Sequence, residues 1–395
     1  MHGNHKCRIT MLKVADGDCF FVEFFYEENS FNILVDTGPV SCWGTVLKPF
    51  LDQLIVDGKK IDVLLITHID GDHIGGAIKL FESEKYSSLI DQVWFNGLRQ
   101  IAFDNTKVVT ENEIKAFRKL ETLHWHDTED VNGPISAKQA ESLSGLLAKR
   151  GIVANSFVEG LSINSDTASI QISPGFFIDF LLPTAEILEK LKTKFQIAMK
   201  KTVLNASLVV TSEGESAFEH VMLDENAELE QTELISGSLF NVTNIEKWAS
   251  TACGNDPSIT NASSIAVCIR FYGRKLLFPG DAPAEDLLKA LDDWSHQNEE
   301  NLYFDVVKLP HHGSSKNCNK LLEQVDGRYY LVSTDGVKFA HPSKEAIAKT
   351  VVRHTDRKRY LLFNYANEMY ELFNNEATKK KYNYCVAVQT TPLEI

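Results

Sequence analysis

The chain has 395 residues, of which 44% are hydrophobic and 24% charged, a composition typical of a soluble globular protein with room for two or three domains. Its formal net charge of −14 argues against a protein that coats nucleic acid non-specifically, because phosphate affinity comes mainly from Lys and Arg. The charge does not exclude a nuclease, since bound cations can reverse the field at a site.

Cysteine usage and the N-terminus indicate the compartment. Seven cysteines are scattered along the chain without a C-x-x-C pair, which favours reduced thiols in a cytoplasmic protein over a disulfide framework. Residues 1–6 do not open an apolar signal-peptide core, and no run of roughly eighteen apolar residues occurs. We therefore expect a cytoplasmic protein without membrane contact.

The N-terminal quarter predicts strands and helices in alternation. Apolar runs rich in β-branched and aromatic residues predict strands at 9–14, 19–26, 31–35, 63–66 and 93–95. Helical periodicity predicts helices at 46–56 and 77–84. The run 63–66 is short and continuously apolar, as expected of a strand buried on both faces.

The rest of the chain divides into a polar middle and a regular C-terminal part. Residues 100–160 are predicted to be mostly helical, with 111–123 and 137–150 as the amphipathic segments. A lysine-rich helix is expected at 185–201 and a solvated acidic loop at 213–233. Further strands are predicted at 176–182, 264–271, 275–278, 306–309, 329–333, 360–363 and 385–389, and further helices at 284–291 and 343–353.

Potential metal ligands are concentrated where predicted strands end. Directly after 63–66 stand His68, Asp70, Asp72 and His73, four side chains that can bind a divalent cation within six positions. Three later strands end in Asp281, in the pair His311 and His312, and in a loop that reaches His341. Loops at strand ends are where rigid scaffolds place functional groups, so four such endings predict one shared site.

Taken together, these motifs resemble the metallo-β-lactamase fold superfamily, and within it the branch that includes the hydrolase domain of the competence protein ComEC. The matching segments are 14–18, 34–38, 67–76, 261–264, 278–281, 311–314 and 340–342. The resemblance implies an α+β fold, an αββα sandwich of two mixed sheets flanked by helices. Residues 1–96 would form its first half, 97–257 an inserted central region that no motif anchors, and 258–395 its second half with the C-terminal strands.

The resemblance also implies a ligand set for two divalent metal ions, Zn²⁺ or Mn²⁺. His68 and Asp70 are expected on one metal, and Asp72 and His73 on the other. Asp281 is expected to bridge the metals, with His312 completing the second site. Asp70 stands where many members of the superfamily carry histidine, and its carboxylate favours a harder cation such as Mn²⁺.

Other residues receive supporting roles by the same resemblance. Asp36 is expected to orient the metal-binding loop without binding metal. Asp72, His311 and His341 are the predicted catalytic residues, with His311 either replacing His312 as a ligand or contacting substrate. Three more residues are candidate contacts for a phosphate or a leaving group: Ser314, Lys308 and Thr334. Lys308 takes this role only if its strand turns the side chain toward the site.

Two questions stay open at the level of sequence. Many superfamily members supply another histidine between the second motif and the bridging aspartate, and this chain has no convincing equivalent. His124, His126 and His220 lie in helical or acidic contexts, and Asn261 stands near the expected place. Asp16 and Asp18 are either turn residues or members of the site.

The predicted function is metal-dependent hydrolysis by a metal-activated hydroxide, most simply by a phosphodiesterase or nuclease. A first alternative is hydrolysis of a lactam, ester or thioester. A second is a regulatory or binding subunit with an incomplete metal site. The expected partners are a nucleic acid or phosphodiester substrate and, by analogy alone, other proteins of a multi-component system such as antiviral defence. The oligomeric state is left open.

Overall fold

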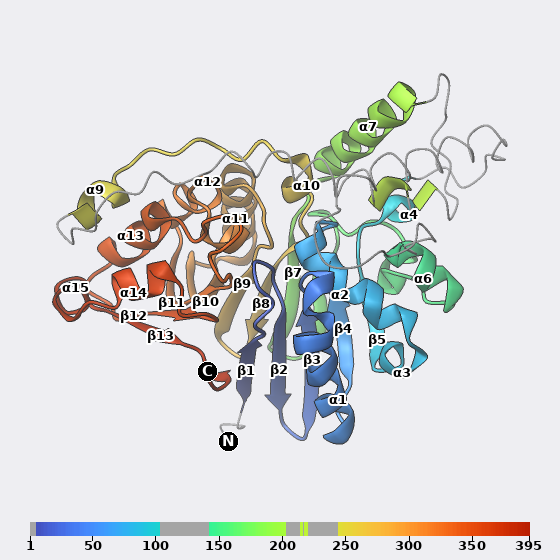
Figure 1. The fold of residues 1–395 in the computed structure, drawn as a ribbon, viewed down its shortest axis with the longest axis horizontal. Helices are drawn as coiled ribbons and strands as arrows, with labels where there is room; N and C mark the ends of the chain where they lie inside the picture. The colour runs from blue at the N-terminus through green and yellow to red at the C-terminus, as the bar shows by residue number, and fades with distance from the viewer. Residues whose placement is uncertain (1–4, 103–141, 203–213, 216, 220–243) are drawn as a thin grey trace.

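Two mixed β-sheets face each other at the centre of the molecule, with helices on their outer faces (Figure 1). The computed structural model describes residues 5–102, 142–202, 214–215, 217–219 and 244–395. The expected αββα sandwich is confirmed. The predicted helix 111–123, part of the predicted helix 137–150 and most of the acidic stretch 213–233 lie outside the described residues.

The first sheet has six strands in the order β14-β1-β2-β3-β4-β5. Strands β1, β2 and β3 pair antiparallel, and β3, β4 and β5 pair parallel. Because β3 and β4 run in the same direction, Asp36 and Thr67 leave the sheet at one edge. Their bounds are β1 Lys6–Met11, β2 Phe20–Tyr26, β3 Asn29–Val35, β4 Ile61–Leu65, β5 Ile90–Trp94 and β14 Leu393–Glu394.

The second sheet has eight strands in the order β13-β12-β11-β10-β9-β8-β7-β6. Strands β9 to β13 are parallel, so the loops that follow β9, β10 and β11 gather at one edge. Strands β6 and β7 belong to this sheet although they fall within the predicted central region, whose boundaries stay a prediction. The bounds are β6 Ile170–Ser173, β7 Phe176–Leu182, β8 Ala266–Phe271, β9 Arg274–Phe278, β10 Tyr303–Lys308, β11 Asp326–Val332, β12 Arg359–Phe363 and β13 Tyr384–Val388.

Helices cover both outer faces, with α1 and α2 on the first sheet and α11 and α13 on the second (Figure 1). The described helices are α1 Lys48–Val56, α2 Gly71–Glu82, α3 Glu84–Ser87, α4 Leu98–Ile101, α6 Leu143–Lys149, α7 Ala185–Thr202, α9 Ile245–Ala249, α10 Ile259–Ala262, α11 Ala284–Asn298, α12 Ser315–Cys318, α13 Lys344–Val352, α14 Glu368–Phe373 and α15 Glu376–Tyr382. Among them none is long and apolar enough to cross a membrane.

Three hydrophobic cores correspond to the three interfaces between these four layers. In β2, Phe20, Val22 and Phe24 enter the core between the sheets, whereas Phe21 enters the core beneath α1 and α2. This alternation is the period of two that a strand imposes on its side chains. Each buried phenylalanine contributes roughly 1.5–3 kcal/mol. The third core lies between the second sheet and α11, α13 and α14.

Helix α2 begins earlier than the predicted helix 77–84, since its first turn already starts at Gly71. Two glycines of the motif serve close packing. A Cβ on Gly75 would overlap the backbone of Val40, and one on Gly76 the carbonyl oxygen of Thr37. The metal-binding motif therefore lies at the N-terminus of a helix that is pressed against the loop after β3.

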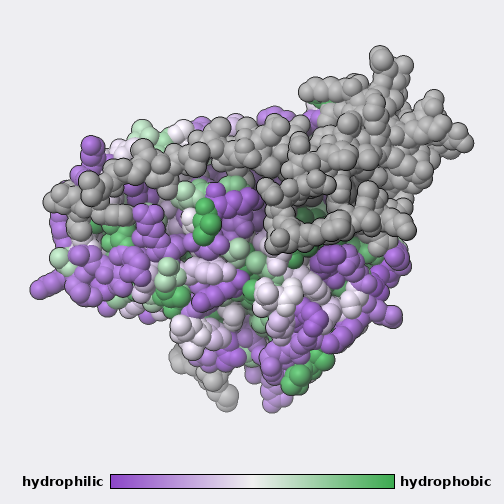
Figure 2. All heavy atoms as spheres, viewed as in Figure 1, coloured by the Kyte–Doolittle hydropathy of each residue, from purple (hydrophilic) through white to green (hydrophobic). Residues whose placement is uncertain are grey.

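The described surface in Figure 2 is mostly hydrophilic around α13 and α15 at the left end. Hydrophobic residues occur there in small groups. Two strongly exposed apolar side chains are Val337 at 82% and Val56 at 79%. Such isolated residues are normal on a globular protein and need no functional explanation.

Candidate metal centre

The loop that follows β4 is held by the buried carboxylate of Asp36. Its Oδ1 accepts the Thr67 backbone N–H at 2.8 Å, and its Oδ2 accepts the Thr67 hydroxyl at 2.8 Å. His73 Nδ1 lies 2.8 Å from the same Oδ2. Since a carboxylate can only accept, the hydrogen-bond network assigns the proton of His73 to Nδ1 and leaves Nε2 to face the centre. Asp36 therefore stands in the orienting position expected of it.

His68 and Asp70 form the first group of predicted ligands. His68 Nε2 lies 3.3 Å from Asp70 Oδ2, and both residues are buried. His68 Nδ1 lies 3.0 Å from the hydroxyl of Thr67, which already donates to Asp36 and so accepts here. Asp70 is the N-cap residue of α2, but its side chain makes no capping hydrogen bond. The two side chains expected on one metal are thus in contact.

The second group collects around Asp281 Oδ2. This oxygen lies 3.4 Å from His73 Nε2 and 3.5 Å from His312 Nε2. Asp72 Oδ2 lies 3.1 Å from His312 Nε2 and 3.6 Å from His73 Nε2. The structure therefore brings Asp72, His73, Asp281 and His312 together, and the rings of His68 and His73, with centroids 4.2 Å apart, join the two groups.

Strong negative potential fills this space. Burial disfavours protonation of His312, but the carboxylates of Asp281 and Asp18 outweigh it and raise the pKa of His312 to about 10. Burial likewise opposes the protonation of His73, whose pKa is nevertheless raised by Asp281, Asp72 and Asp36. A site that holds protons this tightly attracts cations in general.

The donor set fits a divalent metal. The Nε2 atoms of His68 and His73 are buried and have no hydrogen-bond partner, which is costly for a polar atom unless something else satisfies it. Asp18, His73, Asp281 and His312 offer ligand atoms within 4.8 Å of one another. Imidazole nitrogens backed by a carboxylate and a hydroxyl are the usual surroundings of metal-bound histidines. The buried Asp/His cluster could therefore hold metal.

His311 is held from behind by residues that sequence reasoning did not identify. Its Nδ1 lies 3.2 Å from Asn317 Oδ1 and 3.6 Å from Asp256 Oδ2. Asp256 in turn accepts the side-chain N–H groups of Asn261 and Asn317, at 2.8 and 2.9 Å. Although burial raises it, the pKa of Asp256 is held down to about 2, chiefly by His311. His311 Nε2 is thereby turned toward Asp281 Oδ2, 3.8 Å away.

Asn261 therefore lies beside the centre as a neighbour of His311. No sequence signal pointed to Asp256, which stands in the unanchored region before the 261–264 motif. The other candidates for the missing histidine, His124, His126 and His220, lie outside the described residues.

His341 lines the outer side of the centre. It is 6% exposed, and its ring centroid lies 5.3 Å from that of His311. Burial and the neighbouring charges of His311 and His312 hold the pKa of His341 well below its usual value, so its imidazole is neutral. Ser314 is buried, and the hydroxyl of Thr334 accepts the Gly336 N–H, while their contact with a phosphate or leaving group stays a prediction.

The structure shows where Asp18 and Lys308 lie, two of the residues whose place the sequence left open. Asp18 precedes β2, which runs opposite to β3, and so reaches the edge where Asp36 lies. It is 1% exposed and takes part in the buried cluster. Lys308 is also 1% exposed and points into the centre, where it contacts Asp18 and Asp281.

Four residues around the centre have left-handed backbone. Asp36, His311, His312 and Ala340 have φ values of 56°, 48°, 53° and 56°. For residues other than glycine each such conformation costs on the order of 1–3 kcal/mol. Strain of this kind persists where the surrounding structure enforces it, and here it aims two neighbouring imidazoles.

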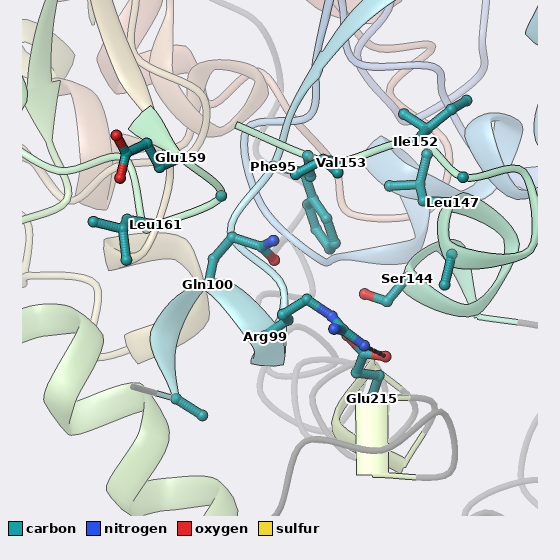
Figure 3. A pocket seen from close by; sticks show the side chains of 15 residues that line it. Phe95, Arg99, Gln100, Ser144, Leu147, Ile152, Val153, Glu159, Leu161 and Glu215 are labelled. Atoms are coloured by element: carbon teal, nitrogen blue, oxygen red, sulfur yellow. Dashed lines mark hydrogen bonds and ion pairs between the residues drawn. The ribbon is translucent and has the colours of Figure 1, made fainter. Parts of the chain in front are cut away.

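A separate cavity of about 380 Å³ lies between α4, α6 and the loop 150–161. Figure 3 shows Arg99 meeting Glu215 on one side and the apolar Leu147 and Ile152 on another. The Arg99 Nε and Glu215 Oε1 are 2.9 Å apart. None of the predicted metal or catalytic residues lines it.

A family model described as the metallo-beta-lactamase superfamily matches residues 13–136. The match includes Asp36 and the whole of 67–76, and ends before Asp281 and His312. No curated protein matches the chain. The matched family model, the sandwich and the buried Asp/His cluster together indicate a metal-dependent hydrolase of the metallo-β-lactamase fold.

Proposed function

We propose that the protein is a metal-dependent phosphodiesterase that cleaves nucleic acid or another phosphodiester. The observation that carries this proposal is the oxygen-rich donor set. Three carboxylates, from Asp70, Asp72 and Asp281, face the same space as the imidazoles of His68, His73 and His312. Oxygen donors suit harder cations, and phosphoryl transfer depends mainly on positioning and on neutralised charge.

Divalent cations held by these six side chains would act as Lewis acids and would lower the pKa of a bound water molecule. The chain's own residues then have to bind and orient the substrate. His341, neutral and nearly buried, can donate one ring N–H to a phosphate oxygen. The ComEC-like resemblance of the His311-His312-Gly313-Ser314 loop supports the same substrate class.

Two lysines at the outer side of the centre support an anionic substrate. Lys316 stands in α12, directly after the His311–Ser314 loop, and its charge is a minor contribution to the lowered pKa of His341. The side chain of Lys338 is 63% exposed and lies 3.4 Å from Asp16, whose carboxyl feels the charges of Asp72 and His312. They offer positive charge beside the centre of a chain whose net charge is −14. Partner proteins, and a role in defence, belong to this proposal only by analogy.

A paired substrate assay tests the assignment. Protein loaded with Mn²⁺ or Zn²⁺ is expected to cleave bis-p-nitrophenyl phosphate and DNA, and to leave nitrocefin and simple lactones intact. Intact DNA together with rapid turnover of nitrocefin or a lactone would assign the first alternative instead. A sample that retains less than one metal equivalent and hydrolyses none of these substrates would assign a binding subunit.

The control variant for this assay is Asp62→Asn. Asp62 lies on β4, the strand that leads into the motif, but its Oδ2 accepts the Asn32 N–H at 2.7 Å, well before the carboxyl end of the strand. The phosphodiesterase rate of this variant is expected to match that of the wild type. The rates of Asp72→Ala and Asp281→Ala are expected to fall to background.

A further inference from the structure

Lys308 occupies a position from which it cannot reach substrate. Its Nζ contacts Asp18 Oδ2, lies 3.2 Å from Asp281 Oδ1 and donates to the Gly280 carbonyl at 2.9 Å. An ammonium group has three N–H donors, and these three acceptors use them all. With 1% of the residue exposed, Lys308 acts inside the protein and not on a phosphate.

The contact with Lys308 fixes which oxygen Asp281 offers. Because Oδ1 is bonded to the ammonium group, Oδ2 is the oxygen turned toward His73 and His312. Without Lys308, Asp281 Oδ1 would lose its hydrogen bond, and two buried carboxylates would lose the largest of their counter-charges, with only the neighbouring histidines left. An unpaired buried carboxylate is strongly unfavourable, so Asp18 and Asp281 depend on this lysine.

Asp18 contacts His312 as well as Lys308. Its second oxygen, Oδ1, lies 3.3 Å from His312 Nδ1, which also lies 2.8 Å from the Ser333 carbonyl. These acceptors assign the proton of His312 to Nδ1 and leave Nε2 for the centre. Asp18 Oδ2 thus contacts the Lys308 ammonium group, whereas Oδ1 is buried, faces His312 and has no hydrogen bond of its own. Asp18 also lies within the cluster of potential ligands, so its part in metal binding has to be tested directly.

We propose that Asp18 and Lys308 form an internal ion pair that positions Asp281 and His312 for metal binding, and that Asp18 is not itself a metal ligand. The pair lies behind the ligands, as carboxylates and carbonyls do behind metal-bound histidines. The inference depends on the metal centre alone and holds whichever bond the protein hydrolyses.

The backbone supports this arrangement. The Asp18 N–H donates to the Asp72 carbonyl at 3.3 Å, and the Asp18 carbonyl accepts the Gly38 N–H at 2.8 Å. The turn before β2 is thereby tied both to the metal-binding motif and to the loop after β3. The ion pair thus links three loops of the first sheet edge to β10 of the second sheet.

Lys275 provides a matched control for Lys308. It is buried, 9% exposed, and its Nζ also has three acceptors: Glu300 Oε2 at 2.9 Å, Asn301 O at 2.6 Å and Asn301 Oδ1 at 3.2 Å. It lies at the start of β9, whereas Asp281 follows the end of that strand. Loss of either lysine removes a buried ammonium group, but only Lys308 contacts the centre.

The experiment measures Mn²⁺ affinity by competition with a chelator, and the melting temperature in EDTA, for Lys308→Met and Lys275→Met. We expect about a tenfold or greater loss of affinity for Lys308→Met, and a change of less than about threefold for Lys275→Met. Equal affinities in the two variants, or tighter binding by Lys308→Met, would overturn the positioning role.

Asp18→Asn tests the second half of the proposal and keeps the shape of the side chain. Metal stoichiometry and the visible absorption spectrum of the Co²⁺-loaded protein report on the ligands directly. We expect Asp18→Asn to keep the wild-type stoichiometry and spectrum, whereas Asp281→Asn loses them. Loss of a metal equivalent, or a spectrum altered as in Asp281→Asn, would show that Asp18 is a ligand. Neither readout depends on the substrate, so failure of the phosphodiesterase proposal would leave the result standing.

Discussion

Asp36→Asn is a nearly isosteric change that is expected to weaken metal binding without removing a ligand. The amide oxygen of asparagine can still accept the Thr67 N–H, but its NH₂ group replaces the oxygen that faces His73 Nδ1 at 2.8 Å. To accept from this NH₂ group, His73 Nδ1 has to give up its proton. The proton of the neutral ring then moves to Nε2, the atom that points to the centre.

The expected loss of metal affinity follows from that change of the His73 tautomer. A protonated Nε2 has no lone pair for a metal, and changes to the groups that hold a metal-bound histidine from behind cost about 10–100-fold in metal affinity, or roughly 1.4–2.7 kcal/mol. The metal-free protein is expected to lose about 1–2 kcal/mol of unfolding free energy, because charge-assisted hydrogen bonds become neutral ones.

The assay pairs a chelator competition for Mn²⁺ with ¹⁵N NMR of the imidazole rings, which reports the tautomer of His73. Asp62→Asn, a carboxylate on β4 outside the centre, serves as the control. Metal affinity equal to that of the wild type in Asp36→Asn, with the Nε2–H tautomer observed, would refute this reasoning.

Three more predictions concern close packing, a buried carboxylate and the His341 loop. A Cβ on Gly17 would overlap the Asp72 carbonyl oxygen, so Gly17→Ala should lower the melting temperature and the metal affinity; Gly44→Ala, where a Cβ meets nothing within 4 Å, should do neither. Glu219 accepts the backbone N–H groups at the start of α6, and burial raises its pKa from 4.5 to about 7. Its contribution to stability is therefore fully present below pH 4.5 and is lost as the pH rises through about 7, and Glu219→Gln should flatten this dependence in urea melts. His341→Ala should keep the wild-type metal content and lose at least about tenfold in the rate of bis-p-nitrophenyl phosphate hydrolysis, whereas an unchanged rate would remove it from the catalytic residues.

Much of the fold was predictable, because strand periodicity is a local property of the sequence. The predicted strand 176–182 coincides with β7, and 360–363 differs from β12 by one residue. The pairing of β6 with β7 and of β14 with β1 was missed. Both β6 and β14 are short and only partly buried, so their sequences carry a weak apolar pattern.

The centre was predictable to the extent that ligands follow strand ends. Asp70, Asp72, His73, Asp281 and His312 come together as the topology requires, although their binding of metal stays a prediction. What sequence could not show are contacts that depend on side-chain direction or on distant packing. Lys308 turns inward because it ends a buried strand beside two carboxylates, and Asp256 reaches His311 from a segment without a motif.

Metal occupancy and phosphodiester hydrolysis must rise together if the buried centre is catalytic, and a single titration measures both. Mn²⁺ is added to metal-free protein while the rate of bis-p-nitrophenyl phosphate hydrolysis is followed alongside bound metal, with Asp281→Asn as the reference. The rate is expected to rise in proportion to occupancy of the centre and to stay at background in Asp281→Asn. Hydrolysis that already runs at its full rate without metal, or a fully occupied centre that leaves the phosphodiester intact, would contradict a metal-dependent phosphodiesterase.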